Sequence, residues 1–179
     1  MNLTDSLDPF TMKMFLFLAR DPLGNFYQRE LARTLGISLG KTNQVLKLLE
    51  AEELLLKEER GKINLYSYNP GNPLGRQLKI LSTLAELNNL RMRLRENSEK
   101  IILYGSSAEG EDTTESDLDL LIITSEKKKA GETIAANRRS MKRRVSELIL
   151  TQLEYSGLKK QDKPLYRQIT RGIILWSAK

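Results

Sequence analysis

The stretch "YGSSAEGEDTTESDLDLLI", residues 104–122, decides the fold of the second half of this chain. It follows the apolar run "IIL" and contains a Gly-Ser pair, a polar spacer and two aspartates that alternate with leucines. Successive side chains of a strand point to opposite faces, so Asp117 and Asp119 should share one face while Leu118 and Leu120 enter the core. Two carboxylates this close repel each other unless a cation lies between them. The stretch therefore predicts two strands around a turn, with a divalent cation at one edge.

The composition limits the kind of cation. The chain has 179 residues and contains neither cysteine nor histidine, which excludes disulfides and thiolate or imidazole metal sites. A metal here must have oxygen ligands, which favours magnesium, manganese or calcium. No apolar run approaches the roughly 20 residues of a membrane helix, and the N-terminal sequence lacks the pattern of a signal peptide. We therefore expect a cytoplasmic protein.

The charge distribution is uneven along the chain. The formal net charge is +6. Residues 101–126 contain seven acidic residues and no Lys or Arg, whereas residues 127–179 contain fourteen basic residues and four acidic ones. An acidic patch beside a basic segment suits a metal site next to a phosphate-bearing partner. An ordinary solvated surface would explain the same pattern.

The clearest break in the sequence is "NPGNPLG", residues 69–75, because its prolines and glycines fit neither a helix nor a central strand. We expect a helix-turn-helix domain at 1–73, a connector helix at 74–97 and a second domain at 98–179. The connector "LGRQLKILSTLAELNNLRMRLRE" repeats leucines at helical spacing. One of its stripes could pack on the second domain and another on a second copy of the chain, so we expect a homodimer.

The first half has the pattern of a winged helix. Helices are predicted in "DPFTMKMFLFLAR", in "YQRELARTLGI" and in a segment that Ser38 caps, "SLGKTNQVLKLLEAEE". The following "LLLKEERGKINLYSY" predicts a hairpin around Arg60-Gly61. A helix-turn-helix followed by a hairpin makes a winged helix. The sequence resembles bacterial and archaeal winged-helix regulators over about residues 10–69.

That resemblance implies binding to duplex DNA. The helix after Ser38 would be the recognition helix, whose first residues reach base edges, and the hairpin would contact phosphates. The candidate DNA-binding residues are Ser38, Lys41, Thr42, Asn43 and Lys47 in the helix, and Arg60 and Lys62 in the hairpin. Winged helices also mediate dimerisation and protein contacts, so this alternative stays open.

The Gly-Ser pair adds a phosphate site to the aspartates. Gly105 lets a ligand approach the backbone closely, and Ser106 offers a hydroxyl donor. The ordered set of Gly105, Ser106, Ser116, Asp117 and Asp119 resembles the signature of the DNA polymerase β-like nucleotidyltransferases, especially their minimal forms, over about residues 98–176. The resemblance implies an NTP substrate and Mg²⁺ or Mn²⁺ bound by the two aspartates. The predicted fold is α+β, with an N-terminal winged helix domain, a connector helix and a C-terminal mixed sheet with helices.

The family uses a third carboxylate on a later strand, and Glu147 in "RRVSELILTQ" is the candidate for it. Two departures from the family pattern are Glu147 itself, where Asp is usual, and Glu109, where minimal members often carry Arg. The resemblance implies transfer of a nucleoside monophosphate to a protein or nucleic-acid acceptor, which a basic helix at 137–144 could contact. The alternative is a winged-helix regulator or antitoxin whose second domain is inactive and serves in ligand sensing or dimerisation.

Overall fold

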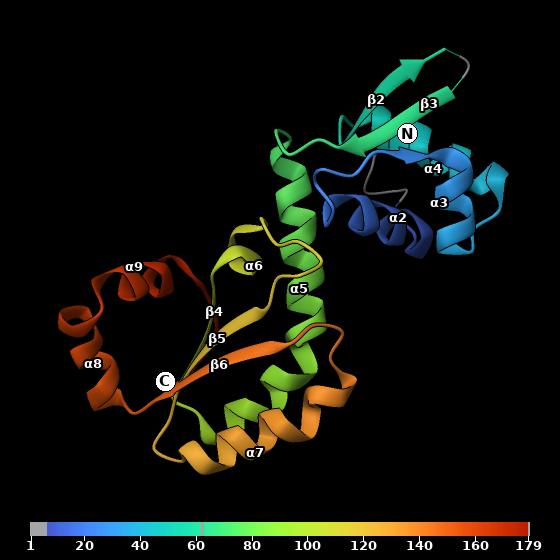
Figure 1. The fold of residues 1–179 in the computed structure, drawn as a ribbon. Coiled ribbons are helices and arrows are strands. Elements are labelled where there is room, and N and C mark those ends of the chain that lie inside the picture. The colour runs from blue at the N-terminus through green and yellow to red at the C-terminus, as the bar shows by residue number, and fades with distance from the viewer. Residues whose placement is uncertain (1–6, 62, 179) are drawn as a thin grey trace. The chain divides into compact units, whose positions relative to one another are not determined.

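The computed structural model describes residues 7–61 and 63–178. The chain divides into two compact units, one ending at Gln77 and the other beginning at Leu78. Helix α5 (Pro73–Leu94) crosses this boundary. Each unit combines helices with one β-sheet, which confirms the predicted α+β fold class (Figure 1).

The first unit is a winged helix. Its helices are α2 (Pro9–Ala19), α3 (Gln28–Leu35) and α4 (Leu39–Ala51), and its strands are β1 (Phe26–Tyr27), β2 (Leu55–Arg60) and β3 (Ile63–Tyr68). The strands are antiparallel in the order β1-β3-β2. Strands β2 and β3 form the predicted hairpin, which is the wing.

Local sequence sets the ends of these helices. Asp8 caps α2 by accepting a hydrogen bond from the Thr11 backbone N–H at 2.7 Å, and Ser38 caps α4 in the same way. Gly36 ends α3 with φ at 65°, a left-handed conformation that glycine adopts without steric cost. The short turn between α3 and α4 therefore follows directly from its residues.

The second unit is a four-stranded mixed sheet with helices on both faces. Its elements after α5 are β4 (Lys100–Tyr104), α6 (Ser106–Glu109), β5 (Leu118–Ile123), α7 (Lys127–Asn137), β6 (Val145–Leu150), α8 (Gln152–Gln161), α9 (Lys163–Arg171) and β7 (Ile173–Ser177). The strand order is β6-β5-β4-β7. Strand β4 is antiparallel to β5 and β7, whereas β5 and β6 are parallel and are joined through α7.

The two faces of this sheet bury different helices. One face packs against α5 and α7, with Leu90 and Ile134 in its core. The other face packs against α8 and α9 through Leu158 and Ile169. Figure 1 shows α7 on one side of the sheet and α8 with α9 on the other. Successive residues of β5 and β6 point to opposite faces of the sheet, so neighbouring side chains in these strands meet different pairs of helices.

One sequence expectation about this unit was wrong. Residues 137–144 do not form one basic helix, because α7 ends at Asn137 and is followed by a 3₁₀ turn at Arg138–Ser140 and an irregular segment at 141–144. In the described part of the chain, no helix combines the length and apolar character needed to cross a membrane.

Candidate nucleotide and nucleic-acid sites

Asp117 and Asp119 lie at the start of β5. Asp119 is paired with Tyr104, the last residue of β4, and Asp117 directly precedes the strand. The alternation of the strand places both aspartates on the face that carries Leu121. Burial raises the pKa of Asp119, a hydrogen bond with Ser146 opposes this rise, and the negative charge of Asp117 adds to it. The two carboxylates are thus close enough to repel each other.

Gly105 joins β4 to α6 directly beside this pair. Its φ is 72°, a region that side-chain-bearing residues rarely adopt. A Cβ atom at this position would lie 2.5 Å from Asp119 Oδ2. Both its conformation and the space therefore require glycine, and the carboxylate of Asp119 lies against the Gly105-Ser106 turn.

Glu147 does not join the pair. In the parallel ladder, Asp119 is opposite Ser146 and Leu120 is opposite Glu147, so Glu147 lies on the other face of the sheet from Asp119. There it accepts a hydrogen bond from Arg138 Nη2 at 2.7 Å. No group of three or more carboxylates among the described residues is placed to hold a metal ion. The residue of β6 that lies beside Asp119 is Ser146.

An exposed arginine side chain lies next to the carboxylate pair. Arg144 is 81% exposed, and its Nε lies 3.6 Å from Asp117 Oδ2. A hollow of about 290 Å³ adjoins it, lined by Arg138, Met141, Lys142, Arg143, Arg144 and Val145. Positive charge at this edge of the site would attract a phosphate-bearing molecule.

In the winged helix, α4 exposes a narrower face than the sequence suggested. Lys47 is exposed and Asn43 is partly exposed. Thr42 is fully buried, and its hydroxyl donates a hydrogen bond to the Ser38 carbonyl at 3.0 Å. Thr42 therefore stabilises the first turn of α4 and does not face solvent. Gln44, two positions further on, is exposed.

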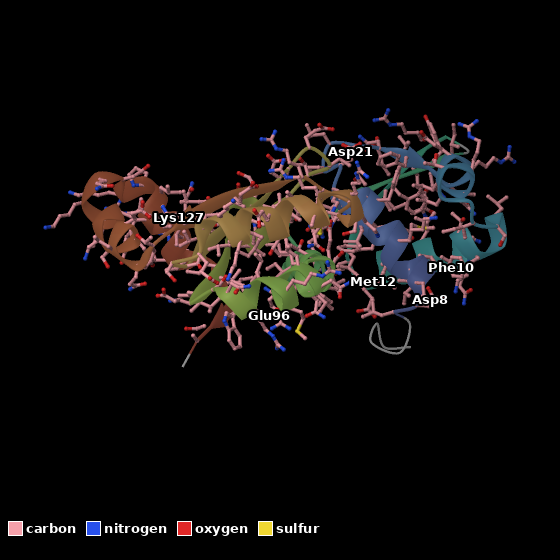
Figure 2. All side chains as sticks on the ribbon, turned by 90° about the horizontal axis from the view of Figure 1, so that it is seen from below. Asp8, Phe10, Met12, Asp21, Glu96 and Lys127 are labelled. Atoms are coloured by element: carbon pink, nitrogen blue, oxygen red, sulfur yellow. The ribbon has the colours of Figure 1, made fainter. Side chains whose placement is uncertain are left out.

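Lys41 is already paired within the unit. Its Nζ lies 2.6 Å from Asp8 Oδ2 and 5.9 Å from the ring centre of Phe10. Figure 2 labels Asp8 and Phe10 at the start of α2. The hydrogen bond from Lys41, followed by that from the Thr11 backbone, lowers the pKa of Asp8 to about 2. DNA would have to compete with Asp8 for this lysine.

The wing carries matched charges. Arg60 Nε donates to Glu58 Oε1 at 2.8 Å, and Lys57 Nζ lies 2.9 Å from Glu59 Oε1. Arg60, Glu58 and Glu59 are largely exposed, and Lys57 is partly exposed, so the pairs are weak and can open towards a phosphate. Lys62, the other predicted wing contact, lies outside the described residues.

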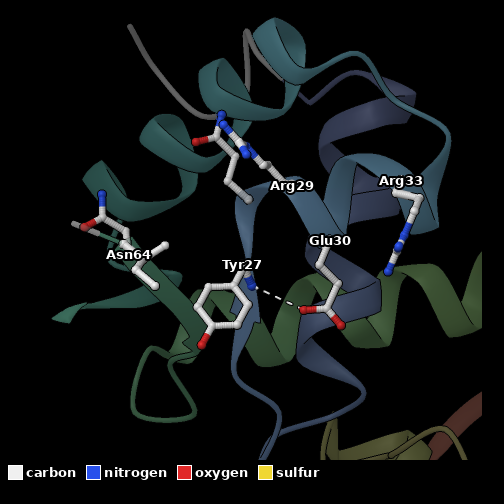
Figure 3. Close-up of a pocket in the computed structure, with 7 residues that line it drawn as sticks. Tyr27, Arg29, Glu30, Arg33 and Asn64 are labelled. Atoms are coloured by element: carbon white, nitrogen blue, oxygen red, sulfur yellow. Dashed lines mark hydrogen bonds between the residues drawn. The ribbon is translucent and has the colours of Figure 1, made fainter. Parts of the chain in front are cut away.

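A pocket of about 840 Å³ lies between the start of α3 and the wing (Figure 3). It is lined by Tyr27, Gln28, Arg29, Glu30, Arg33, Ile63 and Asn64. Arg29 and Arg33 are exposed, and the Tyr27 backbone N–H donates to Glu30 at 3.4 Å. Sequence reasoning missed both arginines, although their spacing of four residues on α3 puts them on one helix face.

Family comparison covers the second unit. A model of the family described as "Polymerase beta, Nucleotidyltransferase" matches residues 86–179, which is just over half of the chain. The chain belongs to this nucleotidyltransferase family. A search of curated proteins gives no match.

Solved structures resemble parts of this family member. NolR from Sinorhizobium fredii is 24% identical over 48% of this chain and 78% of that chain, with a TM-score of 0.37. ZitR from Lactococcus lactis is 24% identical over 46% of this chain and 61% of that chain, with a TM-score of 0.34. A "putative nucleotidyltransferase" from Sulfolobus solfataricus is 17% identical over 61% of this chain and 93% of that chain, with a TM-score of 0.39.

The second unit also contains a buried charged cluster that sequence reasoning missed. Its members are Lys79, Thr83 and Glu86 of α5, Ser107 of α6, Asp112 of the spacer, and Arg143 just before β6. The one feature of the sequence that could have indicated this cluster is the spacing of its three α5 residues. They are four and three residues apart, which puts them on one face of a helix that is otherwise rich in leucine. Asp112 and Arg143 gave none, because they belong to segments that are otherwise polar.

Proposed function

We propose that this chain is a DNA-binding nucleotidyltransferase that transfers a nucleoside monophosphate from an NTP to an acceptor. The observation that supports the proposal is the carboxylate pair of Asp117 and Asp119 against the Gly105 turn, in a domain of this family. A turn without a side chain allows phosphates to approach the backbone, and the carboxylates supply the charge that a divalent cation needs beside them.

The donor set fits Mg²⁺ or Mn²⁺. Asp117 and Asp119 are oxygen ligands, and the pKa of Asp119 is raised by burial and by its neighbour's charge, a cost that a bound cation would relieve. When bound, the cation would offset the charge of the triphosphate and of the departing pyrophosphate. Asp117 and Asp119 would hold it between them.

The other residues have separate roles in this proposal. Ser106 donates its hydroxyl to a phosphate oxygen, and Arg144 adds positive charge beside Asp117. An acceptor hydroxyl attacks the α-phosphorus, and the bond to pyrophosphate breaks. Because Glu147 lies on the opposite face, it is not placed to take the proton that the acceptor hydroxyl releases, and this proton passes to water.

A second function is favoured by one observation. Ser146 stands beside Asp119 where the family resemblance leads one to expect a third carboxylate. A serine cannot serve as a metal-binding anion or as a strong base at neutral pH. The domain would then bind the metal–NTP complex without transferring it and would act as a nucleotide sensor for the winged helix.

One experiment separates the two functions. Binding of Mn·ATP is measured by electron paramagnetic resonance, and labelled NTPs are incubated with candidate acceptors, for the natural protein and for the Asp117→Asn/Asp119→Asn variant. Binding with transfer, both lost in the variant, supports the enzyme, whereas binding without transfer supports the sensor. Absence of Mn·ATP binding, or equal binding by the variant, refutes the carboxylate site in both proposals.

The DNA-binding part of the proposal concerns α4 and the wing. Exposed Lys47 and the arginines Arg29 and Arg33 offer cations on the α3–α4 side of the unit. Lys47→Ala should weaken duplex DNA binding and reduce the slope of log K against log salt by about 0.9. Lys128→Ala, which removes an exposed lysine of the second unit, is the matched control. An unchanged slope for Lys47→Ala would exclude this lysine from the interface.

Winged helices commonly read two half-sites as a dimer. We therefore propose that the chain acts on DNA as a homodimer. Light scattering during size-exclusion chromatography, with and without DNA, measures the mass of the particle. Two chains in each particle on DNA would support the homodimer, and one chain would contradict it.

A further inference from the structure

Arg143 is the centre of the buried cluster in the second unit. It belongs to the basic segment at 137–144, yet its guanidinium points into the domain, and only 6% of the side chain is exposed. Nη1 donates to Asp112 Oδ2 at 2.7 Å, Nη2 donates to Thr83 Oγ1 at 2.8 Å, and Nη2 also contacts Glu86 Oε2 at 3.1 Å. One planar side chain thus joins α5, the spacer and the segment that leads into β6.

The charges of this cluster are balanced. Lys79 Nζ lies 3.6 Å from Asp112 Oδ1, and it donates a hydrogen bond to the Asp112 carbonyl. Two cations therefore face two carboxylates, Asp112 and Glu86, in a region that is almost fully buried. Buried charges are costly unless each is paired. Such a set has few alternative arrangements, so it holds its backbone segments in one geometry.

Ser107 connects this cluster to the carboxylate pair. Its hydroxyl accepts a hydrogen bond from Arg143 Nη1 at 3.3 Å and donates one to the backbone carbonyl of Asp117 at 3.2 Å. A serine hydroxyl has one proton and two acceptor positions, so both bonds can exist together. Ser107 is fully buried and follows Ser106 directly in α6. Ser107 therefore links the turn, which it follows in the chain, to the backbone of Asp117 that the proposed nucleotide site uses.

We propose that Ser107 and Arg143 are positioning residues, which set the distance between the Gly105-Ser106 turn and Asp117 before nucleotide binds. This inference rests on the proposed function for its ligand, but the geometry that carries it is independent of any ligand. The buried cluster fixes Arg143, Arg143 orients the Ser107 hydroxyl, and the hydroxyl holds the Asp117 backbone. Neither residue touches the substrate in this scheme.

Ser107→Ala is the sharpest test, because it removes one oxygen and leaves the four charged side chains of the cluster in place. A typical hydrogen bond contributes about 1 kcal/mol, so Mn·ATP should bind roughly five-fold more weakly. Amide hydrogen exchange without ligand should be about five-fold faster in residues 105–117 and unchanged in β5 and β6. The melting temperature should fall by roughly 4–8 °C, because the same hydrogen bond also stabilises the folded domain.

Ser140→Ala is the matched control, since it removes a hydroxyl that donates to a backbone carbonyl, that of Asn137 at 2.8 Å, outside the cluster. It should change neither measurement. Natural Mn·ATP affinity in Ser107→Ala would overturn the proposal, because a residue that merely stabilises the fold would lower the melting temperature and leave binding intact. If the natural protein binds no Mn·ATP, the proposed function fails, and the exchange experiment alone decides: faster exchange supports positioning and unchanged exchange overturns it.

Discussion

Replacing Arg143 by methionine should destabilise the second unit strongly. The variant fills similar volume but leaves Glu86, whose side chain is 11% exposed, without its cation. A glutamate of ordinary acidity needs about 3.7 kcal/mol to take up a proton at pH 7, at about 1.36 kcal/mol for each pH unit. This value agrees with the roughly 3–5 kcal/mol lost when one partner of a buried ion pair is removed. Small domains are stable by about 5–15 kcal/mol, so the variant should still fold.

Urea unfolding followed by tryptophan fluorescence measures this loss. Trp176 is the one tryptophan of the chain, it lies in β7, and it packs against the core of the second unit. With an m-value of about 1.3 kcal/mol per M, a loss of about 4 kcal/mol lowers the midpoint by roughly 3 M urea. Arg144→Met removes an exposed arginine from the next position and should change stability by less than about 0.5 kcal/mol.

A double variant tests the stated cause. Adding Glu86→Gln to Arg143→Met removes the unpaired charge, so at least half of the lost stability should return. If Arg143→Met unfolds at the natural midpoint, the buried pairing contributes nothing and the reasoning is refuted. If the loss occurs but Glu86→Gln recovers none of it, the cause is packing and not charge.

The remaining predictions concern the site and the first unit. Gly105→Ala should cost about 1–3 kcal/mol and abolish Mn·ATP binding, because its Cβ would meet Asp119 at a positive φ; natural affinity in that variant would contradict the site. Glu147→Gln should leave Mn·ATP affinity within about two-fold, because the hydrogen bond that Glu147 makes, worth about 1 kcal/mol, lies on the other face of the sheet from Asp119. A larger loss of affinity would show that Glu147 belongs to the nucleotide site. The folded pKa of Asp8, about 2, lies below its unfolded value near 4. Its stabilisation is therefore present above about pH 4 and is lost as the pH falls to 2. Asp8→Asn, which keeps a capping oxygen, should lower stability by about 0.5 kcal/mol at pH 6, allowing for solvent screening of the pair with Lys41, and by clearly less at pH 2, where about half of the Asp8 carboxyl is protonated. Equal losses by circular dichroism at both pH values would contradict this.

Several features of this protein could be predicted from short stretches of sequence. Ser38 and Gly36 set helix ends through bonds and backbone angles of their own neighbourhood. The alternation in "SDLDLLI" places Asp117 and Asp119 on one face whatever the rest of the chain does. Each of these features depends on residues within about one helical turn or one strand, so no distant partner is needed to decide it.

The face of Glu147 depended on a partner strand. Ser146 and Glu147 are neighbours, and a strand that moves by one residue exchanges its two faces. The pairing of Asp119 with Ser146 decided which of the two meets the carboxylate pair. Because β5 and β6 are joined through α7 and an irregular segment, nothing local to β6 determines this register.

The destination of Arg143 was likewise set by the tertiary structure. In the sequence it is one of three consecutive basic residues, Lys142, Arg143 and Arg144, and all three look equally suited to the surface. Packing turned the middle one towards Asp112, which is 31 residues away along the chain. The sequence by itself determined the helix ends, the strands and the aspartate pair, because these depend on local periodicity. Only the tertiary structure decided which charges are buried together, because a buried ion pair exists only once distant segments have met.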